Sequence, residues 1–373
     1  MPRVHGGNIY EAAALLGCEP EDILDFSASI NPLSAPVGLF TRFNKSWNRL
    51  RHYPDIHNQE LTGAIAAFHG VAPERVAAGN GSTELLYWLP KALRCSRAVI
   101  ALPTFGEYVR AFEVQGVAMR AVHALPENGY QPTIGQIEEA LAGFRPDAVL
   151  ITHPGSPSGT LLPRQVREWL IAKCADDNVV CMVDEAFTDF CEEESFKEFL
   201  HGDRPLVLIR SMTKFYGIPG LRLGYVLASE AIARRLRQCL PPWGVNTMAQ
   251  IAGCYCLEQT VYRDKTLELM DQERPRMAAA LASIEGIEVF PGVANYLMAR
   301  LDNSLPAAAE LRDDLVRSHR IMVRDCASFG VGDRCVRVAI RLPDENDRLI
   351  SALSAWVESR HRDRTREPAA VMV

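Results

Sequence analysis

The sequence predicts an α/β protein with a mostly parallel sheet, followed by a smaller α+β region. Short runs rich in Val, Ile and Leu recur along the middle of the chain, which is typical of strands buried on both faces of a sheet. Stretches whose apolar residues recur at helical spacing separate these runs. After about residue 243 the pattern changes to longer helical stretches, which indicates a second region.

The strands of the first region are predicted from their apolar runs, which alternate with helices as in parallel sheets. These runs lie at 98–102, 148–152, 179–183, 206–209 and 225–228. The clearest helical stretches between them lie at 136–144 and 163–174.

The second region is predicted to contain helices at 247–269, 274–283 and 307–319 and a strand-like segment at 335–341, with a further segment at 289–300. Pro241 and Pro242 would stop a helix and mark a boundary before it. We therefore expect three parts: an N-terminal arm at 1–45, a large domain at 46–243, and a small domain at 244–373 that ends in a loose tail after about residue 360.

The charge balance argues against nucleic-acid and membrane partners. Among 373 residues, 40 Lys and Arg oppose 46 Asp and Glu, so a net charge of -6 creates no general basic field. No window reaches the roughly 18 apolar residues of a membrane helix, and the first residues lack the apolar run of a signal peptide. We expect a small-molecule partner and a cytoplasmic location.

Ten cysteines are scattered along the chain, which favours reduced thiols. The close pair Cys254 and Cys256 has one intervening residue and no second cluster nearby. This spacing is not that of zinc or redox motifs, so no metal site is predicted.

The strongest local signal is the segment 211–225, which follows a predicted strand. The hydroxyls of Ser211 and Thr213 and the guanidinium of Arg222 surround Lys214 in sequence, and glycines allow tight turns. These groups suit a dianionic phosphate held close to an amine. A lysine that forms a Schiff base needs cationic or desolvating neighbours that lower its pKa. Taken alone, Lys214 could equally be a solvated lysine at a strand end.

Two further segments carry polar groups at element ends. Gly81, Ser82 and Thr83 open a helical stretch, whose free N–H groups can bind an anion, although a simple helix cap explains them as well. Asp184 follows the strand at 179–183, where α/β sheets bind ligands, and could pair with a pyridinium nitrogen or only cap the next helix.

Taken together, these motifs resemble the fold-type I pyridoxal-phosphate (PLP) enzymes of the aspartate aminotransferase superfamily. Ser211 lies three residues before Lys214 and Arg222 eight after it, as in that superfamily. The resemblance covers nearly the whole chain in order, through Tyr53, 81–83, Phe105, 156–159, Asp184, Ser211, Lys214, Arg222 and Arg337.

The resemblance implies a seven-stranded sheet sandwiched by helices and bound pyridoxal 5'-phosphate. It implies that Lys214 forms a Schiff base with the cofactor, that Asp184 pairs with the pyridine nitrogen, and that Phe105 stacks on the ring. The cofactor phosphate would be held by Gly81, Ser82, Thr83, Ser211, Thr213 and Arg222.

Two more roles follow from the resemblance. Tyr53 looks like the tyrosine that reaches the cofactor phosphate of a neighbouring subunit, which implies a homodimer with shared active sites. Arg337 looks like the arginine that binds the substrate α-carboxylate in two places. Without the resemblance, Tyr53 would be a turn aromatic and Arg337 a charge on a strand face.

Within the superfamily the chain is similar to two subgroups, the cobalamin-pathway threonine-phosphate decarboxylases and the histidinol-phosphate aminotransferases. The segments 5–13, 241–246 and 323–326 look like the first subgroup, and Phe187 stands where aminotransferases usually carry Tyr. The reaction implied is loss of carbon dioxide from L-threonine O-3-phosphate to give (R)-1-amino-2-propanol O-2-phosphate. An aminotransferase acting on another phosphorylated amino acid stays open, and so does phosphoserine as the substrate.

The two negative groups of such a substrate would set which Cα bond lies out of the cofactor plane. We expect Arg337 to bind the carboxylate and Arg324, with His5, to bind the phosphate, although the two arginines could exchange roles. Asn31 could line the same pocket or serve only as a turn residue before Pro32.

Ser156 departs from the superfamily pattern, because it occupies the position of an asparagine that binds the cofactor's ring hydroxyl. Serine is shorter, and Phe187 has no phenol to compensate. We therefore expect a changed cofactor affinity, a changed pKa of the bound cofactor, or a changed choice of substrate.

Overall fold

The computed structural model describes residues 6–366, which form two compact units. The larger unit comprises residues 30–268 with 292–294, and the smaller one comprises residues up to 29, 269–291 and from 295 onward. The division differs from the expected boundary near residue 243 and falls inside α11 (Thr260–Ala282). The reason is that α10 (Thr247–Leu257) packs against α2 (Leu39–Ser46) and α3 (Gln59–His69) of the larger unit.

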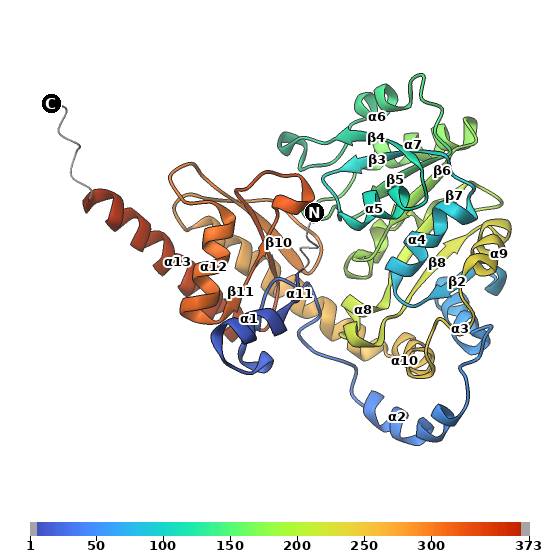
Figure 1. Cartoon of the computed structure of the whole chain (residues 1–373), viewed down its shortest axis with the longest axis horizontal. Helices are drawn as coiled ribbons and strands as arrows, with labels where there is room; N and C mark the ends of the chain where they lie inside the picture. The colour runs from blue at the N-terminus through green and yellow to red at the C-terminus, as the bar shows by residue number, and fades with distance from the viewer. Residues whose placement is uncertain (1–5, 367–373) are drawn as a thin grey trace. The chain divides into compact units, whose positions relative to one another are not determined.

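A seven-stranded sheet forms the centre of the larger unit, as expected from the resemblance (Figure 1). Its strand order is β2-β8-β7-β6-β5-β3-β4, and all neighbours are parallel except β8, which is antiparallel to both β2 and β7. The strands are β2 (Val76–Gly79), β3 (Arg97–Leu102), β4 (Ala118–His123), β5 (Ala148–Thr152), β6 (Val180–Asp184), β7 (Leu206–Ser211) and β8 (Gly224–Ala228).

Five of these strands match the predicted runs within one or two residues, whereas β2 and β4 were not predicted. The β2 strand is short and made of small residues, and β4 is an edge strand whose residues are mostly exposed or half-buried. Neither pattern gives the continuous bulky apolar run of an inner parallel strand.

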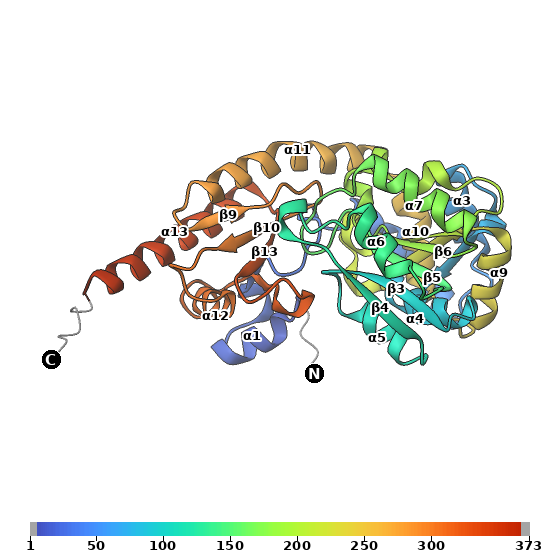
Figure 2. The ribbon, with the colours of Figure 1, turned by 90° about the horizontal axis from the view of Figure 1, so that it is seen from above.

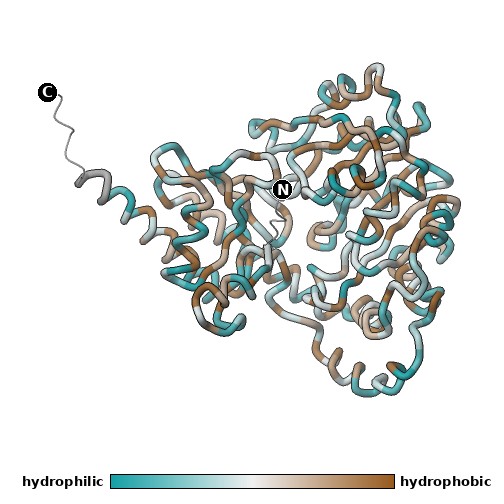
Figure 3. Tube along the Cα trace, viewed as in Figure 1, coloured by the Kyte–Doolittle hydropathy of each residue, from teal (hydrophilic) through white to brown (hydrophobic). Residues whose placement is uncertain are grey.

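Helices cover both faces of this sheet, with α4 and α5 on one face and α6 and α7 on the other (Figure 2). On the first face Leu85, Leu89, Tyr108 and Phe112 pack against strand residues such as Ile209 in one apolar core. The remaining helix bounds are α4 (Ser82–Ala92), α5 (Glu107–Glu113), α6 (Ile134–Leu141), α7 (Arg164–Asp176), α8 (Met212–Phe215) and α9 (Glu230–Cys239). Hydrophobic residues concentrate along the strands, whereas α2 alternates between hydrophobic and hydrophilic positions (Figure 3).

The smaller unit is α+β, as predicted. Its four-stranded sheet has the order β12-β13-β10-β9, with antiparallel neighbours, and β1 pairs with β11 in parallel. Its elements are α1 (Ile9–Leu16), β1 (Leu24–Asp25), β9 (Ile287–Val289), β10 (Tyr296–Leu301), α12 (Ala308–His319), β11 (Ile321–Met322), β12 (Arg324–Asp325), β13 (Cys335–Ala339) and α13 (Pro343–Arg366).

Two expectations for the chain after residue 243 are wrong. The tail does not loosen at residue 360, because α13 continues to Arg366, and Arg360 forms ion pairs with Glu310 and Asp314 of α12. The helix expected at 247–269 breaks after Leu257, and α11 then runs through Pro275. The residues 367–373 of the expected tail lie outside the described residues. In the described part of the chain, no helix combines the length and apolar character needed to span a bilayer.

Candidate active site

Lys214 lies in the short helix α8, directly after the end of β7. Its Nζ atom donates a hydrogen bond to Ser211 Oγ at 3.2 Å, and the hydroxyls of Ser211 and Thr213 are 2.8 Å apart. Ser211 and Thr213 are buried, and the amine lies 5.3 Å from the centre of the Phe187 ring. The motif predicted from sequence therefore brings an amine and two hydroxyls together at one strand end.

Asp184 is the last residue of β6, the strand next to β7, and its side chain is buried. Its carboxylate accepts hydrogen bonds from Tyr108 Oη at 2.6 Å and from the Ala186 N–H at 2.8 Å. Burial raises the pKa of Asp184 above its ordinary value, while these two hydrogen bonds and the charge of Lys214 oppose that rise. The Asp184 carboxylate is therefore fixed near Lys214, where it can pair with a cationic group.

Sequence reasoning missed Tyr108, which completes this pair. Burial and the Asp184 charge raise the pKa of Tyr108 well above 10, so its phenol keeps the proton that it donates. Phe105, a predicted site residue, lies edge-to-face with Tyr108, with ring centres 5.9 Å apart. The spacing of three residues puts both aromatic rings near the start of one helix. This spacing is the feature of the sequence from which Tyr108 could have been found.

Gly81 and Arg222 form the third part of the site. Gly81 precedes α4 with φ of +84°, a backbone conformation that favours glycine, and a Cβ atom there would lie 2.5 Å from the end of the Arg222 side chain at Nη2. Gly224 of β8 is equally restricted, because a Cβ atom would collide with the backbone nitrogen of Ser82. The N-terminus of α4, with Ser82 and Thr83, therefore lies beside a guanidinium, as an anion site requires.

These residues fit the cofactor that the resemblance implies. PLP carries an aldehyde, a ring nitrogen and a phosphate. The larger unit supplies an amine for the aldehyde and a buried carboxylate for the ring nitrogen. For the phosphate it supplies hydroxyls, a helix N-terminus and a guanidinium. Gly81 and Arg222 approach each other closely where the proposed phosphate-binding groups meet.

A buried ion pair is formed by the residues next to Asp184 and Ser211 in sequence. Glu185 and Arg210 adjoin Asp184 and Ser211 in sequence, and side chains alternate between the faces of a strand. Glu185 Oε2 and Arg210 Nε are 2.8 Å apart, and neither side chain is exposed. Arg210 also pairs with Glu192. Sequence reasoning did not identify this network, whose members lie far apart along the chain.

Asn31 is buried, and its amide group bonds to the protein itself. Its Nδ2 atom donates to the Phe215 carbonyl at 2.7 Å and to Thr266 Oγ1 at 2.8 Å, and its Oδ1 accepts from the Leu33 N–H. The backbone N–H of Asn31 donates to the Lys214 carbonyl at 3.0 Å. These contacts favour the turn alternative, in which Asn31 fixes the position of α8.

Ser156 is buried in the loop between β5 and α7. The loop is held by hydrogen bonds from the Gly155 N–H to the Thr160 carbonyl at 2.8 Å and from the Val293 N–H to the Gly159 carbonyl at 2.9 Å. These hydrogen bonds hold the loop on both sides of Ser156.

Tyr53 is 80% exposed in the larger unit and stacks on Trp243, with ring centres 4.8 Å apart. The surrounding segment exposes further large apolar side chains. These are Val37 (95% exposed), Phe40 (76%), Trp47 (64%), Leu50 and Ile56.

The predicted substrate arginines both lie in the smaller unit, on adjacent strands. Arg324 of β12 faces Arg337 of β13 directly, and both side chains are buried. Arg324 also lines a cavity of about 620 Å³ together with Asn8, Ser27 and Arg317. Burial and the charge of Arg337 lower the pKa of Arg324 below its ordinary value. His5, the third predicted substrate residue, lies outside the described residues.

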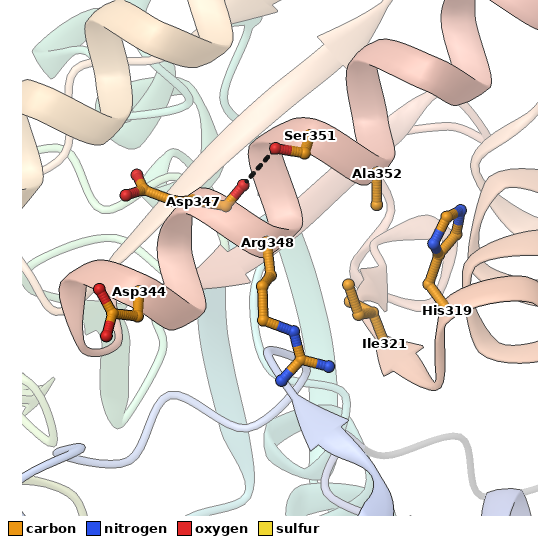
Figure 4. Close-up of a pocket in the computed structure, with 7 residues that line it drawn as sticks. All are labelled: His319, Ile321, Asp344, Asp347, Arg348, Ser351 and Ala352. Atoms are coloured by element: carbon orange, nitrogen blue, oxygen red, sulfur yellow. Dashed lines mark hydrogen bonds between the residues drawn. The ribbon is translucent and has the colours of Figure 1, made fainter.

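A second cavity of the smaller unit, of about 460 Å³, contains no predicted site residue. Arg348 and Ser351 come from α13, and the Ser351 hydroxyl donates to the Asp347 carbonyl at 2.8 Å (Figure 4). The lining residues are His319, Ile321, Asp344, Asp347, Arg348, Ser351 and Ala352.

Comparison with known proteins gives concordant matches over most of the chain. The family model described as aminotransferase class I and II matches residues 22–353. The threonine-phosphate decarboxylase of Salmonella typhimurium is 36% identical over 353 residues, covering 94% of this chain and 95% of that protein. An adenosylcobalamin biosynthesis bifunctional protein of Leptospira interrogans is 31% identical, covering 94% of this chain and 40% of that protein. The histidinol-phosphate aminotransferase structure from Clostridium acetobutylicum matches with a TM-score of 0.84 at 27% identity, covering 90% of this chain and all of that one.

Proposed function

This chain belongs to the aminotransferase class I and II family, and from that premise we propose that it is a PLP-dependent decarboxylase of L-threonine O-3-phosphate in cobalamin biosynthesis. The product is (R)-1-amino-2-propanol O-2-phosphate. The observation that carries the proposal is the meeting of Lys214, Ser211 and the Asp184–Tyr108 pair at the ends of two adjacent strands. The sequence similarity of this chain to a threonine-phosphate decarboxylase, which covers 94% of the chain, supports the choice of reaction. We propose the cytosol as the compartment, because the scattered cysteines favour reduced thiols.

In this proposal Lys214 binds the cofactor covalently through its amine, and Asp184 keeps a proton on the ring nitrogen. Gly81, Ser82, Thr83, Ser211, Thr213 and Arg222 hold the phosphate, Phe105 stacks on the ring, and Ser156 lies at its hydroxyl. When bound, PLP supplies an electron sink for the bond that breaks at the substrate Cα. The Lys214 amine would be the group that moves a proton to the substrate Cα.

The smaller unit supplies the proposed substrate anchors. Arg337 binds the α-carboxylate and Arg324 the phosphate, with His5 assisting. Because each negative group would meet its own guanidinium, the two arginines would fix the orientation of the substrate carboxylate.

The experiment that tests the function is incubation of the PLP-loaded protein with L-threonine O-3-phosphate, with carbon dioxide release and the cofactor spectrum followed together. Continuous release of carbon dioxide with an unchanged final spectrum is the expected result. Conversion of the cofactor to its amine form without gas would instead support the second candidate, a phosphate-substrate aminotransferase, which the likeness to the histidinol-phosphate aminotransferase favours.

Ser156→Asn is expected to strengthen cofactor binding and to lower the pKa read from the bound cofactor's absorbance. The longer amide can donate to the ring hydroxyl oxygen, and a hydrogen bond to a charged group is worth about 1.5–3 kcal/mol, or about one to two pKa units. The measurement is an absorbance titration against pH, with a separate titration of cofactor affinity. Ser158→Asn, two residues further in the same loop, controls for loop distortion. An unchanged pKa and affinity in Ser156→Asn would contradict the role of position 156.

The homodimer is proposed from the exposed apolar segment around Tyr53. Exposed apolar patches mark association sites, and the segment 37–56 exposes several large apolar side chains. Replacing both Phe40 and Trp47 with Asp is expected to give a monomer with weak cofactor binding, since Tyr53 of one subunit would then no longer reach the other subunit's phosphate. Light scattering after size-exclusion chromatography measures the mass. Val261→Asp, an exposed apolar position on α11, is the matched control and should leave the dimer intact. A dimer that survives both Asp substitutions would refute this interface.

A further inference from the structure

The strands that carry the two substrate arginines place like charges side by side. Arg324 and Arg337 are directly opposite in the antiparallel pair of β12 and β13, with only 6% and 8% of each residue exposed. Like charges at directly opposite positions destabilise a sheet, and burial removes the water that would screen them. Arg337 also lies over the ring of Tyr296, whose centre is 4.8 Å from Arg337 Cζ. A feature that sets the separation of the two guanidiniums has to contact both of them.

Phe329 provides such a feature, because its ring contacts both arginines. The ring centre lies 5.1 Å from Arg324 Cζ and 5.4 Å from Arg337 Cζ. Each distance is that of a cation–π contact, which strengthens when water is excluded. The ring is 6% exposed, so both contacts lie out of water.

The position of Phe329 is fixed by the turn that joins the two strands. Phe329 ends the 3₁₀ turn η9 (Ala327–Phe329), and its N–H donates to the Cys326 carbonyl at 2.9 Å. Cys326 in turn donates its N–H to the Cys335 carbonyl at the start of β13. Arg324 Nη2 donates to Ser328 Oγ at 2.7 Å. The turn therefore couples the backbone of both strands to the ring that the guanidiniums share.

We propose that Phe329 is a positioning residue, which sets the separation and orientation of Arg324 and Arg337 and thereby selects substrates that carry two negative groups at matching spacing. The inference rests on the proposed function only for the identity of those groups as carboxylate and phosphate. Phe329 itself touches neither the reacting atoms nor the cofactor in this proposal. A ligand with one negative group needs only one anchor, so it depends less on the spacing that Phe329 sets.

The test compares Phe329→Leu with Phe290→Leu in the PLP-loaded protein. Phe290 is a matched control, since it is also buried in the smaller unit and lies over an arginine, Arg300, which is not a predicted site residue. The probe is 3-(phosphonooxy)butanoate, which is threonine phosphate without its amine and so is not consumed. Calorimetric dissociation constants for this probe and for inorganic phosphate are measured on each protein.

Phe329→Leu is expected to weaken binding of the two-anion probe on the order of 10-fold and binding of inorganic phosphate much less, while Phe290→Leu changes neither. In turnover, Phe329→Leu is expected to raise the KM for L-threonine O-3-phosphate with little change in kcat. Phe329→Tyr, which keeps the ring, is expected to restore the original KM. Equal affinities in Phe329→Leu and Phe290→Leu, or no binding of the probe to the unsubstituted protein, would overturn the inference. If the probe binds as expected but no carbon dioxide is released from L-threonine O-3-phosphate, the proposed function fails and the inference stands.

Discussion

Replacing Lys214 with alanine is expected to lower the rate of carbon dioxide release by at least about 10³-fold. Lys214 Nζ lies within reach of Ser211 and of the Asp184 charge, and the proposal gives this amine both the covalent bond to the cofactor and the proton returned to Cα. The covalent bond is checked independently of turnover. After borohydride reduction, mass spectrometry should find the cofactor on Lys214 in the unsubstituted protein and on no lysine in the variant.

Lys173→Ala is the control for this experiment. Lys173 is an exposed lysine on α7 that pairs with Asp177, so its loss removes an amine without touching the site. Its activity and its reduced adduct at Lys214 should match those of the unsubstituted protein. An active Lys214→Ala variant, or an adduct at another lysine of an equally stable variant, would contradict the assignment.

Asp184→Asn is expected to lower kcat by roughly 30- to 4,000-fold, corresponding to about 2–5 kcal/mol for removing one partner of a buried charge pair. Asparagine keeps the shape of the side chain and can still accept from Tyr108, but it carries no charge opposite the ring nitrogen. Cofactor affinity should fall as well, which an absorbance titration of the cofactor-free protein measures.

Asp147→Asn is the matched control for the charge. The Asp147 carboxylate accepts hydrogen bonds from the N–H groups of Ser96 and Arg97, just before β5 begins. Those hydrogen bonds lower the pKa of Asp147, so the variant removes a stabilised carboxylate from the same unit, away from the lysine. A kcat of Asp184→Asn within twofold of that of Asp147→Asn would remove Asp184 from the mechanism.

Much of the larger unit could be predicted because the sequence pattern of each inner strand is enough to identify it. The strands β5, β6 and β7 are continuous apolar runs, and only burial on both faces of a sheet accounts for such runs. The motif around Lys214 could be predicted for a related reason: Ser211, Thr213 and Lys214 lie within four residues, so their contacts depend on local geometry.

Contacts between distant segments could not be predicted in the same way. Tyr108 and Asp184 are 76 residues apart, and nothing in either segment specifies the other. The roles of Asn31 and of the Glu185–Arg210 pair likewise depend on which strands become neighbours. The helical end of α13 was missed because residues 360–366 carry no apolar period, and the ion pairs of Arg360 with Glu310 and Asp314 join it to a segment far away in sequence.

The sequence by itself determined the fold class, the family and the local lysine motif, because these depend on the order of apolar and polar residues along the chain. Only the tertiary structure decided the neighbours of each group. It placed β8 antiparallel between β2 and β7, which brings Gly224 against the start of α4. It also put Phe329 in contact with two buried arginines. Such contacts form only when strands pair and side chains from distant segments become buried together. They therefore cannot be predicted from the sequence of any single segment.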